Sequence, residues 1–140
     1  MPMEPGGPEK LRVYHLAQDL GTAVDAVLCG YVRHDSLADQ LSRAANSVIL
    51  NIAEGAAHHS PGRKVFHYQT AHGSAAECIE ALTRLHRRHP SPALRSARRI
   101  ANMVCIMLTS LIHAQEKRRR PSARPAVRLP PSVSRPTRRP

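Results

Sequence analysis

Apolar positions recur every three to four residues along four separate stretches of the chain. In the first stretch, residues 9–32, they are spaced alternately four and three residues apart, which is typical of a helix with one buried face. This seam comprises Val13, Ala17, Leu20, Val24, Val27 and Tyr31. No stretch alternates with a period of two, so the sequence predicts helices and no strands.

The second predicted helix begins at Asp35 or Ser36 and ends near Ala57. Either of the first two side chains can accept hydrogen bonds from the free N–H groups of a first helical turn. The apolar seam of this helix comprises Leu37, Leu41, Ala44, Val48 and Ile52.

Serine followed by proline marks two further helix starts, because proline suits the first helical position. Ser60 and Pro61 open a third helix that continues to about Arg88. Ser91 and Pro92 open a fourth helix that fades at Lys117.

The third helix has the weaker apolar side, for which we predict Phe66, Gly73, Ala76, Ile79 or Glu80, Leu82 and Leu85. The fourth carries Ala97, Ile100, Val104, Met107, Leu111 and Ala114. Short connections between long helices favour an all-α fold, an antiparallel up-down-up-down four-helix bundle.

The length of 140 residues suits one domain. We expect a disordered N-terminus over residues 1–8, the bundle over 9–116 and a disordered Arg/Pro-rich tail over 117–140. The net charge is +11, but the predicted tail holds nine basic residues and no acidic one. The bundle itself is therefore only slightly basic, and the tail, with six prolines, cannot bury a core.

Three single cysteines, Cys29, Cys78 and Cys105, lie within apolar helical stretches. An odd, unclustered set predicts reduced core thiols in a cytoplasmic protein rather than a disulfide framework. The first ten residues lack the apolar segment of a signal peptide. The longest apolar run, residues 100–114, is too short and too often interrupted to span a membrane.

Two motifs carry a resemblance to a known family. Asn51-Ile52-Ala53-Glu54-Gly55 follows the stretch 40–48, and Gly73-Ser74-Ala75-Ala76-Glu77 comes later. Together they resemble the bacterial four helix bundle protein family, first noticed as reading frames within intervening sequences of large-subunit ribosomal RNA genes. The same bundle occurs in the accessory variability determinant (Avd) proteins of diversity-generating retroelements. The resemblance covers residues 11–111.

This resemblance implies a homo-oligomer, often a pentameric ring, with basic surfaces. In the retroelement branch the bundle binds a reverse transcriptase and its template RNA. The sequence departs from the family pattern at Ile49 and Leu50, where a serine commonly precedes the asparagine, and in having only Phe66 at the start of the third helix.

An up-down-up-down topology gathers basic residues at one end of the bundle. The expected nucleic-acid-binding residues at this end are Arg33, Arg84, Arg87, Arg88, Arg95, Arg98 and Arg99, with His34, His86 and His89 nearby. Arginines in the first turns of the fourth helix oppose its dipole, which favours an external anion such as an RNA phosphate. The alternative is an ordinary solvated end.

The C-terminal cluster Lys117, Arg118, Arg119 and Arg120 is a second candidate for nucleic-acid contact, because Arg-rich ends commonly bind phosphate without sequence preference. The alternative is a solubilising extension.

Polar and small residues of the two motifs are expected at or beside the helix seams. They comprise Asn51, Glu54, Gly55, Gly73, Ser74 and Glu77. Glu54 and Glu77 are candidates for paired carboxylates in acid–base chemistry, but no nucleophile or phosphate-binding loop accompanies them. Interhelical hydrogen bonds or an interface between subunits are the better interpretation. No histidine or cysteine spacing matches a metal site, and no cofactor is expected.

These observations predict a non-enzymatic, cytoplasmic RNA-binding protein. The resemblance implies that it is homo-oligomeric and that it scaffolds RNA or an RNA/DNA hybrid with a reverse transcriptase. One alternative is an adaptor bundle that binds only proteins. Another is an orphan rRNA intervening-sequence protein without a reverse transcriptase partner.

Overall fold

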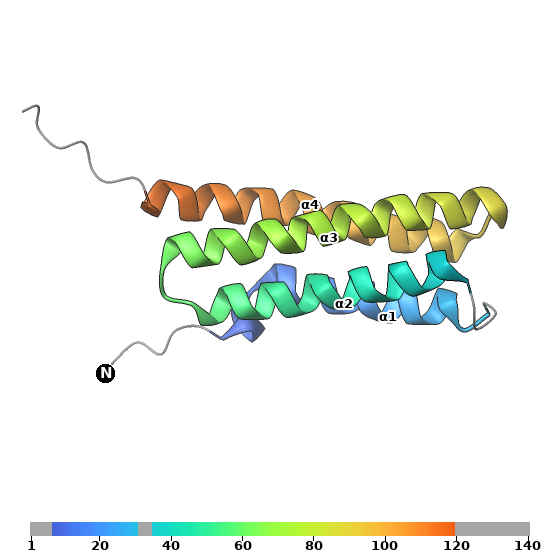
Figure 1. Cartoon of the computed structure of the whole chain (residues 1–140), viewed down its shortest axis with the longest axis horizontal. Coiled ribbons are helices and arrows are strands. Elements are labelled where there is room, and N and C mark those ends of the chain that lie inside the picture. The colour runs from blue at the N-terminus through green and yellow to red at the C-terminus, as the bar shows by residue number, and fades with distance from the viewer. Residues whose placement is uncertain (1–6, 31–34, 120–140) are drawn as a thin grey trace, which may run out of the picture.

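The computed structural model of the chain describes residues 7–30 and 35–119, and every long element within them is an α-helix (Figure 1). A short 3-10 helix, η1 (Pro8–Lys10), precedes α1 (Arg12–Leu28), α2 (Ser36–Ala57), α3 (Pro61–Arg88) and α4 (Pro92–Arg119). Each α-helix packs against the next in the chain, and α1 also packs against α4, which closes the bundle. The predicted four-helix bundle is confirmed.

The helices run alternately in opposite directions (Figure 1). The end of α1, both ends of the α3–α4 connection and the start of α2 therefore lie together at one end. The start of α1, the α2–α3 connection and the end of α4 lie at the other end. Residues distant in sequence thus share the two ends, where the candidate interfaces lie.

The first two helices bury the predicted seams. Four of the α1 positions are buried, from Val13 to Val24, and all five α2 positions are buried. The first helix is shorter than predicted, Arg12–Leu28 instead of 9–32. Val27 is only partly buried and Tyr31 lies outside the described residues.

The predicted core side of α3 is wrong over its first half. Phe66, Gly73 and Ala76 are exposed, as is Glu80, whereas Leu82 and Leu85 are buried as predicted. The buried side comprises Val65, Tyr68, Ala71, Ser74, Ala75, Cys78, Ala81, Leu82 and Leu85. Most of these residues are small or polar, so α3 gives little hydrophobic contrast from which to choose a face.

The stripe predicted for α4 is displaced by one residue at several points. Ala97 and Val104 are buried as expected, whereas Ala114 is exposed. Ile100, Met107 and Leu111 are only partly buried, and the core positions belong to Leu94, Ala101 and Leu108. Apolar residues occur on both sides of this stripe, so spacing alone does not select the buried one.

Two of the three expected helix-start side chains accept a hydrogen bond from the first turn of their helix, and one does not. The Asp35 carboxylate accepts hydrogen bonds from the backbone N–H groups of Leu37 (2.9 Å) and Ala38 (3.4 Å), which confirms it as the cap of α2. The Ser91 hydroxyl accepts from the N–H of Ala93 at 3.2 Å. Ser60 occupies the cap position of α3 but makes no such hydrogen bond, so the prediction that its side chain caps this helix is wrong.

The ring of Tyr68 on α3, which is only 1% exposed, lies directly against Gly55 of α2. A Cβ atom added to Gly55 would lie 2.5 Å from one ring carbon of Tyr68 and 2.8 Å from another. At Gly73, in contrast, no atom lies within 4 Å of such a Cβ. Glycine is thus required by packing at the first position only.

The three cysteines differ in exposure. Cys78 is buried and Cys105 partly buried, but Cys29 is exposed, so the expectation of three core thiols is wrong for Cys29. Burial, with smaller contributions from Glu77 and Cys105, raises the pKa of Cys78 to about 12. Burial also raises the pKa of Cys105. At pH 8 Cys78 is therefore a thiol and not the reactive thiolate.

Gly55→Ala should destabilise the bundle by about 1–3 kcal/mol, because the buried ring of Tyr68 has no room to move aside. Gly73→Ala is the matched control and should stabilise it by about 1 kcal/mol through helix propensity alone. Thermal and denaturant unfolding followed by circular dichroism measures both effects. Equal stability of the two variants would contradict the close approach of α2 and α3.

At pH 8 a thiol-specific disulfide reagent should modify Cys29 quickly, whereas Cys78 should react only when the bundle opens. Stopped-flow absorbance during labelling measures the phases. Cys29→Ser should remove the fast phase. A fast phase that survives when both Cys29 and the partly buried Cys105 are replaced with serine would show that Cys78 is more accessible than its burial implies.

Candidate nucleic-acid interface

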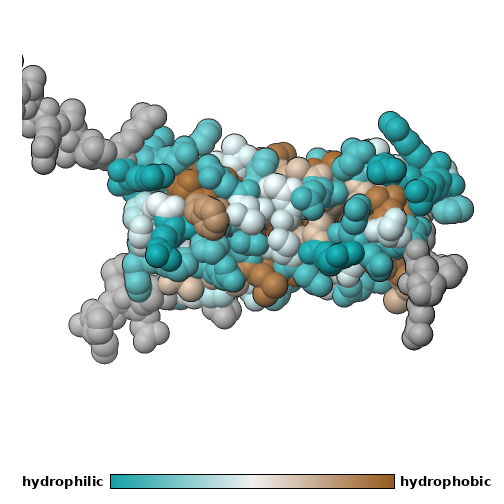
Figure 2. Space-filling view, viewed as in Figure 1, coloured by the Kyte–Doolittle hydropathy of each residue, from teal (hydrophilic) through white to brown (hydrophobic). Residues whose placement is uncertain are grey.

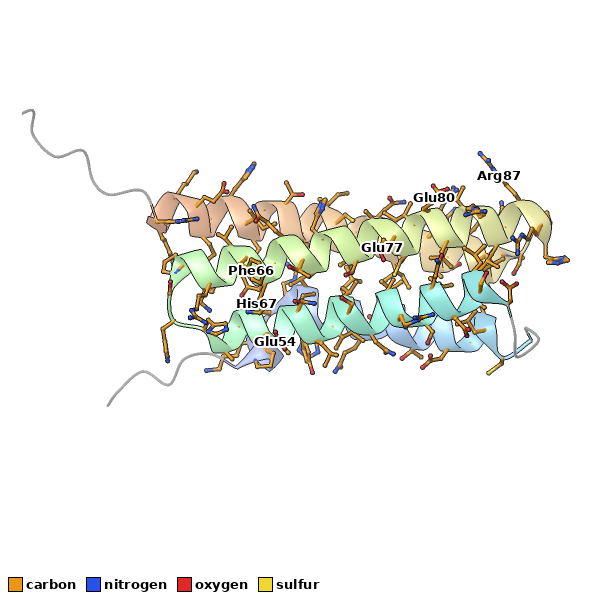
Figure 3. All side chains as sticks on the ribbon, in the orientation of Figure 1. Glu54, Phe66, His67, Glu77, Glu80 and Arg87 are labelled. Atoms are coloured by element: carbon orange, nitrogen blue, oxygen red, sulfur yellow. The ribbon has the colours of Figure 1, made fainter. Side chains whose placement is uncertain are left out.

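The structure brings the predicted arginines together at the end of the bundle that holds the α3–α4 connection. Arg84, Arg87 and Arg88 occupy the last turns of α3, while Arg95, Arg98 and Arg99 occupy the first turns of α4. We call these six residues the arginine end. Figure 2 shows hydrophilic side chains crowded at this end of the viewed face, and Figure 3 labels Arg87 there. Arg33 and His34 lie outside the described residues.

Few carboxylates of the described residues form ion pairs with the arginine end, although Glu77 and Glu80 line a groove with Arg84. The guanidinium Nη1 of Arg88 donates to Oδ2 of Asp35 at 3.4 Å. Within residues 7–30 and 35–119, the other five arginines form no ion pair with a carboxylate. Four of these five are exposed and Arg98 is partly buried. Their positive charge therefore faces solvent and is available to an external anion.

His86 has a different role from the one expected at this end. Its Nδ1 accepts a hydrogen bond of 3.1 Å from the backbone N–H of Ser91, across the α3–α4 connection. This hydrogen bond joins the end of α3 to the start of α4, so His86 holds the connection. The same serine then caps α4, which positions Arg95 one turn into that helix.

A polar chain crosses from α2 to α3 in the middle of the bundle. The hydroxyls of Ser47 and Ser74 are 2.7 Å apart. The Asn51 amide nitrogen donates to the carbonyl of Ser47 at 2.9 Å and to its hydroxyl at 3.2 Å. The expectation of interhelical hydrogen bonds thus fits Ser74, whereas these two Asn51 hydrogen bonds stay within α2. Ser47 was missed, although its spacing of four residues from Asn51 was a usable signal.

The chain continues toward the α2–α3 connection through a histidine that sequence reasoning did not select. His67 Nδ1 lies 3.1 Å from the Glu54 carboxylate and 3.4 Å from the Asn51 amide oxygen. Both neighbours are acceptors, so this ring nitrogen carries the proton. His67 also stacks on His58, with ring centroids 5.0 Å apart and planes 12° apart. Glu54 is thereby held by an α3 side chain.

The two motif carboxylates do not form a pair. Figure 3 shows Glu54 near the end of α2 and Glu77 at the middle of α3. Glu77 instead lines a groove of about 570 Å³ between α2 and α3, together with Arg43, Glu80 and Arg84. The geometry offers no support for acid–base chemistry by Glu54 and Glu77.

The opposite end of the bundle is basic as well. The fourth helix continues through Arg119, so Lys117, Arg118 and Arg119 are helical, and the predicted tail boundary at 117 falls inside α4. Arg120 lies outside the described residues. Burial, and then the positive charge of Arg118, lower the pKa of Lys64 at the start of α3. Cations of α3 and α4 therefore lie close enough to repel each other.

Metal sites and membrane-spanning helices are both absent from the described part of the chain. No three histidine, cysteine, aspartate or glutamate side chains gather there in a way that would hold a metal ion. Nor is any of the described helices long and apolar enough to cross a membrane.

Comparison with known proteins bears on the fold of this bundle. No curated protein matches the chain. A solved structure from Bacteroides thetaiotaomicron, described as a protein of unknown function from the S23 ribosomal protein family, aligns with a TM-score of 0.66 at 18% identity. The alignment covers 72% of this chain and 95% of that one, which supports the fold.

The model of the 23S rRNA-intervening sequence protein family matches residues 9–110, which include α1 to α3 and most of α4. This match confirms the resemblance drawn from the motifs around Asn51 and Ser74. The chain belongs to the 23S rRNA-intervening sequence protein family.

Proposed function

We propose that this protein is a cytoplasmic, non-enzymatic RNA-binding protein whose arginine end contacts the phosphate backbone. The observation that carries the proposal is the gathering of six arginines from α3 and α4 at one end, with a carboxylate partner for Arg88 alone among the described residues. Clustered, exposed guanidinium groups match phosphates in geometry and charge.

Such contacts give affinity without sequence preference. Arginines that neutralise phosphates release condensed counterions, so the affinity falls as salt concentration rises. Because all six residues of the arginine end are arginines, it offers no aromatic ring for base stacking. Base-specific hydrogen bonds need a fixed register, which an exposed cluster does not supply. The RNA would thus be held by its backbone.

Self-association would widen this surface. In a homo-oligomer such as a pentameric ring, several arginine ends would face the same RNA, and multivalency would raise the affinity of a modest single site. The family resemblance supports a ring of this kind and, in its retroelement branch, a reverse transcriptase as partner. We propose that this bundle holds template RNA, or an RNA/DNA hybrid, beside such an enzyme.

A purely protein-binding adaptor is the second candidate. It is favoured by the large apolar side chains exposed on the single chain, namely Leu50, Phe66, Met103 and Ile106. Purification at low salt separates the two proposals, because an RNA-binding bundle carries nucleic acid with it and raises the ratio of absorbance at 260 nm to that at 280 nm.

Replacing Arg95, Arg98 and Arg99 together with glutamine should weaken RNA binding at physiological salt. The slope of log affinity against log salt should flatten by about two for a single strand if each arginine contacts one phosphate. Filter binding or fluorescence anisotropy across a salt series measures both quantities.

The control replaces Lys10 and Arg12 with glutamine, which removes positive charge at the opposite end of the bundle. It should retain most of the affinity and the slope. If the control loses as much affinity as the triple variant, or if neither variant differs from the natural protein, the arginine end is not the contact surface.

A further inference from the structure

Phe66 lies on the surface of α3 near the α2–α3 connection, at the end opposite the arginine end (Figure 3). It is the only phenylalanine in the chain and is 64% exposed. The nearby residues Val65 and Tyr68 on the same helix are buried in the core instead. Single exposed apolar residues are ordinary, so the exposure matters only because of what surrounds this ring.

The rings of Phe66, His67 and His58 pack against one another in series and form an aromatic array. The ring centroid of Phe66 is 5.2 Å from that of His67, at an interplanar angle of 83°. The His67 ring in turn stacks on His58 and is held by the Glu54 carboxylate. Phe66 therefore packs edge-to-face with an anchored neighbour, while most of the residue is exposed to solvent.

Positive charge surrounds this array. Arg63 is exposed one turn before Phe66 on α3. A Cβ atom at Gly62 would lie 3.7 Å from the Arg119 Nε atom, so the end of α4 reaches the start of α3. The Lys64 ammonium donates to the carbonyls of Gly55 and Ala56 at the end of α2.

We propose that Phe66 is a stacking site for a base of single-stranded RNA, with Arg63 and Arg119 binding the adjacent phosphates. Unstacked bases of single strands bind aromatic faces without sequence preference, and a basic surround tracks the backbone. Cations beside the ring favour RNA over an apolar protein surface as the occupant. This inference rests on the proposed RNA binding and adds a preference for single strands.

The test compares oligo(U) with an RNA duplex of the same length. Phe66→Ala should weaken oligo(U) binding about tenfold, the order of one lost base–aromatic stack, and should leave duplex binding and the salt slope unchanged. Phe66→Leu, which keeps apolar volume but removes the π face, should lose as much. Ile106→Ala is the matched control, since Ile106 is 67% exposed on α4 in a groove shared with α1.

A spectroscopic readout is independent of affinity. The chain contains no tryptophan, so Phe66→Trp introduces a single tryptophan, which can be excited selectively over the tyrosines and whose emission oligo(U) should quench on stacking. Ile106→Trp should not be quenched.

Each outcome has a distinct meaning. Equal oligo(U) affinity of Phe66→Ala and the natural protein, equal losses on oligo(U) and duplex, or a changed mass in solution for Phe66→Ala would overturn the stacking site. The last result would assign the ring to a protein interface. If the natural protein binds no RNA, the proposed function fails first; if the arginine-end variant weakens binding and Phe66→Ala does not, only the stacking site fails.

Discussion

The close approach of α2 to α3 is the constraint on which the rest of the structure depends. Gly55 leaves room for the ring of Tyr68, and the small residues Ala44 and Ala81 line the groove between the two helices toward the arginine end. At this separation the hydroxyls of Ser47 and Ser74 can meet directly at 2.7 Å. The register of the two helices then decides which side chains of α3 face the core and which face outward.

The sequence predicts the fold well because its strongest signals agree with one another. The seams of α1 and α2 place valine and leucine at heptad spacing, and prolines or capping side chains mark three helix starts. The same heptad reasoning fails on α3, where Ala71, Ser74 and Ala75 replace large apolar residues. Burial there is decided by contact with the neighbouring helices, which no local pattern reports.

The candidate site was likewise predictable from the sequence only in part. Topology alone brings Arg84 and Arg95 to one end, so their proximity follows from four helices and short connections. The pairing of Arg88 with Asp35 and the hydrogen bond between His86 and Ser91 depend on side-chain geometry across a connection. The helical state of Arg119 was missed because a run of basic residues followed by prolines is also typical of a tail.

The fourth helix joins the two basic ends as one rigid rod. It has 28 residues, from Pro92 to Arg119, and at about 1.5 Å per residue it is about 40 Å long. A nucleic acid touching both Arg95 and Arg119 must therefore span nearly that distance, because neither end can move toward the other without breaking the helix. The length of α4 then fixes the distance between the two contact points on the nucleic acid. This distance would change by about 5 Å for every helical turn added or removed.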